Sequence, residues 1–109
     1  MEHWDLRDIA VEPHQPEVLH SSRGEARSIA IALPAGEELQ EHEVHERTYV
    51  IVVDGEVEIS DASSSVTGGP GLLATFAPHE RHTVKAVSDA RFLLVLAPWP
   101  GDGHPGTRD

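Results

Sequence analysis

Glycine and proline interrupt this chain so often that only short extended segments fit between them. The sequence has nine glycines and eight prolines, and the apolar stretches between them are rich in valine, isoleucine and leucine. Short runs of this kind are typical of strands rather than of helices. The predicted strands cover residues 28–33, 48–53, 72–77, 83–87 and 91–97. Short strands joined by frequent turns indicate an antiparallel sandwich or barrel.

Two local features refine this prediction. Asp54-Gly55 is a favoured two-residue turn, so it predicts a hairpin from residues 48–53 into a second strand through Val57 and Ile59. Residues 37–47 favour a helix by propensity alone, because they are rich in glutamate, leucine and glutamine. A helix there would pass into a β-branched strand without a glycine or proline stop, so we predict that this segment is not helical.

The charge of the chain limits its partners. Eight basic residues stand against 19 acidic ones, for a formal net charge of -11. Such a charge repels nucleic-acid phosphates and anionic lipid heads, so we expect no nucleic-acid partner and no membrane partner. The N-terminus lacks the basic start and apolar core of a signal peptide, and no apolar run is long enough to span a bilayer. We therefore expect a cytoplasmic protein.

Histidine is the residue type that carries the chemistry here. The chain has no cysteine and eight histidines, so a bound metal would be held by imidazole nitrogen and carboxylate oxygen. His42 and His45 precede one predicted strand, and His79 and His82 follow another. The other four are read as surface residues: His3, His14, His20 and His104.

The surroundings of these histidines resemble the two motifs of small single-domain cupins. The first motif is matched at Gly36, His42 and Gly55, while Val44 and Thr48 stand where the family has its second histidine and its glutamate. The second motif is matched at Gly71, Pro78 and His82, and His79 replaces a usual glycine. The resemblance covers roughly residues 28–97.

The resemblance implies a fold and a domain plan. We expect an all-β cupin-like jelly-roll barrel of antiparallel strands, with one domain over residues 1–97 and its core at about 28–97. Tyr49 and Phe76 are expected inside the barrel. Residues 98–109 read as a Pro/Gly-rich tail, which Trp99 would pin as a lid or contact, or which is loosely ordered.

The resemblance also implies that His42 and His82 are ligands of a divalent transition metal, such as zinc, nickel, manganese or iron. The third ligand depends on strand geometry. Strict alternation back from Gly55 turns Glu46 inward, whereas a one-residue bulge turns His45 inward. We favour the set His42, His45 and His82, with Glu46 and His79 as weaker candidates.

The leading hypothesis is a metal-binding monocupin with a small-molecule pocket at the barrel mouth, acting on a polar metabolite if it is an enzyme. The alternative is a metal-free binding or oligomeric module, because Val44 and Thr48 replace two family ligands. Whether the protein is an enzyme stays open. A homodimer is also expected, in which residues 6–11 add to the sheet of a neighbour.

Overall fold

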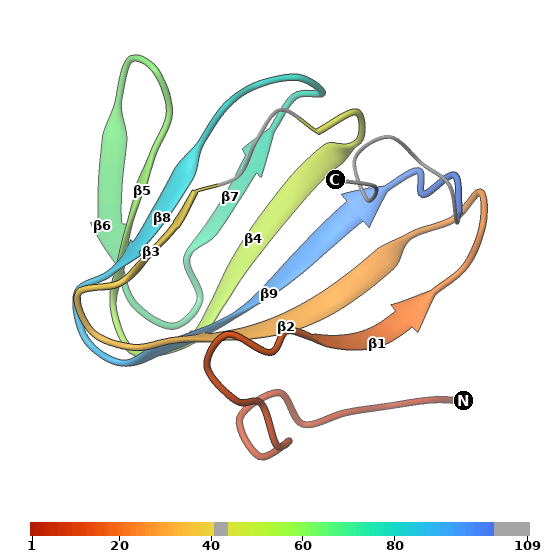
Figure 1. The fold of residues 1–109 in the computed structure, drawn as a ribbon, viewed down its shortest axis with the longest axis horizontal. Coiled ribbons are helices and arrows are strands. Elements are labelled where there is room, and N and C mark those ends of the chain that lie inside the picture. Colours follow the sequence, from red (N-terminus) through yellow and green to blue (C-terminus); the bar gives the residue numbers. More distant parts are fainter. Residues whose placement is uncertain (41–43, 102–109) are drawn as a thin grey trace.

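The computed structural model describes residues 1–40 and 44–101, with the side chain of Gln40 left aside, and contains two antiparallel sheets (Figure 1). The strands are β1 (Glu17–Ser21), β2 (Arg27–Leu33), β3 (Glu38–Gln40), β4 (Arg47–Asp54), β5 (Val57–Ser60), β6 (Ser65–Gly68), β7 (Leu73–Phe76), β8 (Thr83–Ala86) and β9 (Ala90–Ala97). One sheet has the order β1-β2-β9-β4-β7 and the other β3-β8-β5-β6. The predicted all-β jelly-roll architecture is confirmed.

The strands predicted from apolar runs are present in the structure. Residues 28–33, 48–53, 72–77, 83–87 and 91–97 correspond to β2, β4, β7, β8 and β9 within about one residue at most ends. β1 and β3 have no long apolar run that would predict a strand; both are largely polar and lie at sheet edges. The described part of residues 37–47 contains β3 and the start of β4 and no helix, as predicted.

The predicted hairpin at Asp54-Gly55 is wrong. β4 pairs with β7 and β9, whereas β5 pairs with β6 and β8, so the turn carries the chain from one sheet to the other. The β8–β9 connection holds this corner: Val87 N–H donates to the Glu56 carbonyl (2.8 Å), and Glu56 N–H donates to Ser88 Oγ (3.0 Å). These hydrogen bonds to the β8–β9 connection stabilise the turn in place of the expected pairing between β4 and β5.

The core fills the space between the two sheets. Alternate residues of β4 and β9 point inward, which gives both strands a regular burial pattern along their length. The buried apolar residues that pack together are Ile31, Leu33, Val50, Val52, Val57, Ile59, Phe76, Val84, Ala86, Ala90, Phe92, Leu94, Leu96 and Trp99. Three polar residues, Glu46, Thr48 and His82, are buried as well.

The chain continues after β9 along the barrel rather than away from it. Trp99 is 2% exposed, its backbone N–H donates to the Glu25 carbonyl (3.0 Å), and the Arg27 guanidinium lies 4.8 Å from its ring centroid. The start of the tail is therefore held against the barrel, which agrees with the alternative in which Trp99 pins it. A bilayer-spanning helix is not found in residues 1–40 and 44–101.

Candidate metal and ligand site

His82 lies just before β8 and is almost completely buried, with an exposed fraction of 2%. Its ring stacks on that of Phe76, with centroids 3.9 Å apart and planes 9° from parallel. Nδ1 lies 3.5 Å from the Glu80 carbonyl oxygen, a long contact that favours a proton on Nδ1. Nε2 has no hydrogen-bond partner among the described residues. The imidazole therefore presents a buried nitrogen that the fold itself does not satisfy.

The charge state of His82 follows from this environment. Burial lowers the pKa of His82 below its ordinary value of 6.5, and this effect outweighs the Glu80 carbonyl and carboxylate, which favour the protonated ring. His82 is consequently neutral near pH 7. A neutral imidazole has a lone pair on one ring nitrogen, which can bind a metal or accept a hydrogen bond.

Two polar residues, Thr48 in β4 and Glu46 just before it, lie on the same inner face of the sheet as Phe76, which contacts His82. Glu46 is 3% exposed and Thr48 is fully buried, as are Val50 and Val52 further along the strand. Thr48 lies opposite Phe76 in the β4–β7 pairing, which places it beside the ring that contacts His82. Thr48 Oγ1 has no hydrogen-bond partner among the described residues. Thr48 thus faces inward at the place where the resemblance has a carboxylate ligand.

His45 and His79 lie together on the surface. Both are exposed, and their rings meet edge to face with centroids 4.8 Å apart. The backbone N–H of His79 donates to the Val44 carbonyl (2.7 Å), which ties the turn before His82 to the segment before β4. These two imidazoles therefore sit apart from the buried face that Glu46 and Thr48 share.

The structure bears on the two alternatives for the third ligand. β4 pairs with β9 in regular register from Arg47 to Val52, and Glu46, just before the paired strand, is buried, whereas His45 is exposed. His42 lies outside the described residues. Within residues 1–40 and 44–101, no three histidine or carboxylate side chains are grouped closely enough to hold a metal. Nε2 of His82, buried and without a hydrogen-bond partner among the described residues, is available to accept a bond from a bound group.

A groove lies next to this buried face, between the β5–β6 hairpin and β7. It has a volume of about 240 Å³ and reaches Phe76, the same residue that stacks on His82. Its lining is rich in hydroxyl groups and consists of Ile59, Ser60, Asp61, Ser64, Ser65, Val66, Ala74, Thr75 and Phe76. Asp61 is held in place by the backbone N–H groups of Ser63 and Ser64, which lower its pKa.

The expected position of Tyr49 is wrong, because this residue belongs to the opposite face of β4. Phe76 is buried as predicted, but its stacking partner is His82. Tyr49 is half-buried and follows Thr48, so alternation turns it away from the core. The signal was present in the sequence, since Thr48, Val50 and Val52 share a period of two that excludes Tyr49.

Comparison with solved structures identifies the fold. Protein TT1209 from Thermus thermophilus matches with a TM-score of 0.76 and 25% identity, over 92% of this chain and 100% of that chain. An RmlC-like cupin protein of Desulfovibrio desulfuricans matches with a TM-score of 0.75 and 22% identity, over 90% and 96%. An RmlC-like cupin from Methanocaldococcus jannaschii, with a double-stranded β-helix fold, matches with a TM-score of 0.74 and 17% identity, over 92% and 93%.

This protein therefore has the fold of the small cupins, as the motif spacing predicted. No protein-family model matches the sequence, and no curated protein matches it either. The similarity to solved structures covers most of the chain and concerns the barrel as a whole. A shared fold does not define an activity, because one fold hosts many unrelated chemistries.

Proposed function

We propose that this protein is a metal-binding small cupin that takes a small polar molecule at the mouth of its barrel. The observation that carries the proposal is the buried Nε2 of His82, which no described residue satisfies. A buried polar atom without a partner destabilises a fold by about 1–3 kcal/mol, so it is retained more readily where a ligand completes it. A divalent transition metal accepts the lone pair of a neutral imidazole.

The proposed ligands are His42, His82 and one further side chain. Among the two alternatives for the third place, the buried position of Glu46 supports the carboxylate, whereas His45 is exposed and packs on His79. Two imidazoles and one carboxylate form a common ligand set for zinc, nickel, manganese or iron, and leave a coordination position open. When bound, the metal would supply Lewis acidity and lower the pKa of a bound water.

The chain's own residues have defined parts in this proposal. Phe76 holds the plane of the His82 ring by parallel stacking, so the direction of Nε2 is fixed before any ligand arrives. Thr48 offers a hydroxyl on the same inner face, which can donate to or accept from a bound polar group. The hydroxyl-lined groove beside Phe76 offers further hydrogen-bonding groups to such a molecule.

A second candidate function is a metal-free binding module. In this case a polar ligand completes Thr48 Oγ1 and His82 Nε2 by direct hydrogen bonds, since both atoms are buried and without described partners. The hydroxyl at position 48 favours this alternative, because it occupies a place where the family resemblance has a metal-binding carboxylate. The two candidates differ in whether metal is retained when the ligand is removed.

Metal content per chain decides between the two candidates. We expect near-stoichiometric zinc, nickel, manganese or iron by mass spectrometry on protein purified without a histidine tag, and its loss in both His42→Ala and His82→Ala. Glu46→Gln should weaken metal retention, while His45→Ala should keep it. His20→Ala, which changes an exposed histidine of β1, is the matched control and should also keep the metal.

The opposite outcome is equally clear. Protein that stays empty and keeps its melting temperature after exposure to zinc, nickel, manganese and ferrous iron would contradict the metal proposal. Circular dichroism of each variant has to show the native all-β spectrum, so that a loss of metal reports the site and not unfolding. In that outcome, a screen of polar metabolites for an increased melting temperature tests the second candidate.

A further inference from the structure

His45 and His79 form an exposed pair of imidazoles that the buried face does not use. Their rings meet edge to face, with centroids 4.8 Å apart and planes at 83°. His45 lies just before β4 and His79 lies in the turn after β7, so two segments far apart in the sequence bring the rings together. Imidazole nitrogen is the commonest protein ligand of metals. The pair is therefore a candidate for a metal site of its own.

Backbone hydrogen bonds hold the two segments at this distance. The N–H of His79 donates to the Val44 carbonyl (2.7 Å), one residue before His45. Glu80 closes the turn from both sides: its N–H donates to the Ala77 carbonyl (3.1 Å), and its Oε1 accepts from the Ala77 N–H (2.9 Å). Because the backbone is in place before an ion arrives, binding to the pair orders little more than two side chains.

The conformation of His79 is unusual for a residue with a side chain. Its φ is 70°, in the left-handed region that glycine enters without steric cost. An imidazole at this position therefore opposes folding slightly, where glycine would not. His14 is the other such residue within 1–40 and 44–101, with φ of 65°, but its ring contacts a carboxylate, Glu37 (3.3 Å). At His79 the same backbone conformation places the ring against a second imidazole.

We infer that His45 and His79 form a second metal site, on the surface, which takes a divalent transition metal such as nickel or copper. Two imidazoles bound to one metal at a tetrahedral angle have centroids about 5 Å apart, close to the 4.8 Å between these rings. Imidazole ligands favour Cu²⁺ and Ni²⁺ over Mn²⁺. The net charge of -11 attracts cations in general.

This site should bind more weakly than one with three protein ligands. In the described part of the chain, no third histidine or carboxylate is grouped with the pair, so water would complete the coordination of the metal. We expect the ion to exchange with solvent and to be removed by dialysis. The inference is independent of the proposed function, because it uses neither His82 nor Glu46.

Calorimetric titration of the full chain with Ni²⁺ at neutral pH tests the inference. We expect one weakly bound equivalent, whose dissociation constant rises by about 10-fold or more in both His45→Asn and His79→Asn. Asparagine tolerates the left-handed conformation, so His79→Asn should keep the turn. His14→Asn is the matched control: it removes an exposed histidine with the same backbone conformation and should bind Ni²⁺ like the wild type.

Line broadening in nuclear magnetic resonance spectra locates the ion, because Cu²⁺ broadens the amide signals nearest to it. With Cu²⁺ well below one equivalent, the signals of Val44, His45 and His79 should broaden first, and they should stay sharp in His79→Asn. Broadening that begins instead around His3, His14 or His20 would show an adventitious ion only and would overturn the inference.

Two further variants separate this site from the buried one and from unfolding. His82→Ala should lose the metal proposed for the buried face but keep the weak Ni²⁺ equivalent. His79→Gly should lose that equivalent without a lower melting temperature, because glycine relieves the left-handed φ. Ni²⁺ binding that is unchanged in both His45→Asn and His79→Asn would overturn the inference. A wild-type chain that binds no Ni²⁺ at millimolar concentration would overturn it as well.

Discussion

His82 and Thr48 show how single residues of this barrel conflict with the rest of its core. Both side chains are buried among apolar groups, and each has a polar atom without a described partner. Such atoms oppose folding in the free protein, because they lose their hydrogen bonds to water and gain none inside the fold. A ligand that supplies these hydrogen bonds or a metal bond would therefore stabilise the fold by binding.

The pKa of His82 makes the stability of the metal-free protein depend on pH. Because the folded-state pKa lies below 6.5, the unfolded chain binds more protons between the two pKa values, so the free energy of unfolding rises with pH in that window. We expect it to fall as the pH drops below about 6.5 and to be independent of His82 above it. Urea unfolding of wild type and His82→Gln between about pH 5 and pH 8 measures this. Parallel pH profiles for the two proteins would contradict the prediction.

Removing the Thr48 hydroxyl should stabilise the free protein. Thr48→Val keeps the shape of the side chain but removes the unpartnered Oγ1, so we expect the free energy of unfolding to increase by roughly 1 kcal/mol. This corresponds to a rise in melting temperature of about 4 °C for a chain of this size. Thr75→Val is the control, because Thr75 Oγ1 already donates to the Thr48 carbonyl (3.1 Å) and its loss should destabilise. A lower melting temperature for Thr48→Val would show that the hydroxyl is satisfied.

At the scale of elements, the corner between β4 and β5 decides how the chain divides into two sheets. Gly55 has φ of 75°, and a side-chain carbon there would collide with backbone atoms of Asp89, in the β8–β9 turn, and of Ala90, the first residue of β9. These backbone atoms can move only if the turn moves with them. The close approach explains why a glycine is needed at this corner.

Alanine at two glycines separates close approach from backbone strain. We expect Gly55→Ala to reduce the free energy of unfolding by about 3 kcal/mol or more, because it adds a backbone clash to the unfavourable φ. Gly36→Ala should cost about 1–2 kcal/mol, since its φ is 84° but no atom lies within 4 Å of the added carbon. Chemical denaturation measures both. Equal losses in the two variants would contradict the role of the contact with Asp89.

The same corner shows what a sequence can predict in this fold. The β-branched run before Asp54 predicts β4 correctly, because strand preference is local. The partners of β4 are β7 and β9, far along the chain, and local turn chemistry at Asp54-Gly55 carries no information about them. Strict alternation places Glu46 inward and a bulge places His45 inward; from the sequence we favour the bulge, whereas the structure has Glu46 buried and His45 exposed. The stacking of Phe76 on His82 requires two segments to meet in space, so neither segment alone predicts it.

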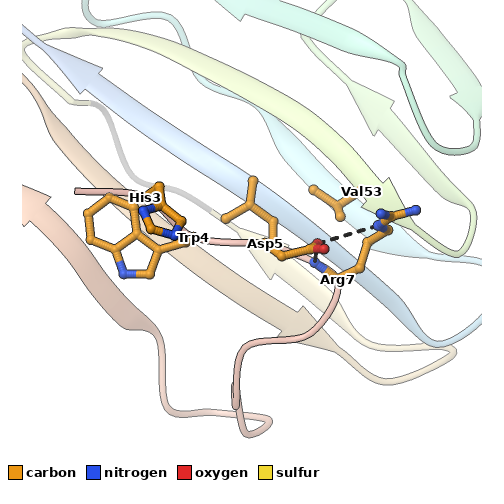
Figure 2. A pocket seen from close by; sticks show the side chains of 6 residues that line it. His3, Trp4, Asp5, Arg7 and Val53 are labelled. Carbon is orange, nitrogen blue, oxygen red and sulfur yellow. Dashed lines mark hydrogen bonds and ion pairs between the residues drawn. The ribbon is translucent and has the colours of Figure 1, made fainter. Parts of the chain in front are cut away.

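At the scale of the whole molecule, the segment after β9 closes the end of the barrel where β2 begins. Trp99 belongs to the core and contacts Arg27, and Gly101 is also buried. The start of the tail is therefore part of the folded body. The opposite end of the chain, with Trp4, borders an open hollow next to Val53 of β4 instead (Figure 2).

The two tryptophans should differ strongly in their contribution to stability. We expect Trp99→Ala to reduce the free energy of unfolding by about 3–5 kcal/mol, because it leaves a large cavity next to β2. Trp4→Ala should change it by less than about 0.5 kcal/mol, as expected for a partly exposed side chain. Thermal and urea unfolding at low protein concentration compare the two variants. A small effect of Trp99→Ala would show that residues 98–101 are not part of the cooperative core.

These positions also give the protein two built-in optical reporters. Trp99 is shielded from water and should emit at short wavelength, while Trp4, 39% exposed, should emit further to the red. In a Trp99→Phe protein the remaining indole lies in the N-terminal segment beside Val53 of β4. Its emission would then follow a movement of that segment without any attached dye, separately from the unfolding of the core that Trp99 reports.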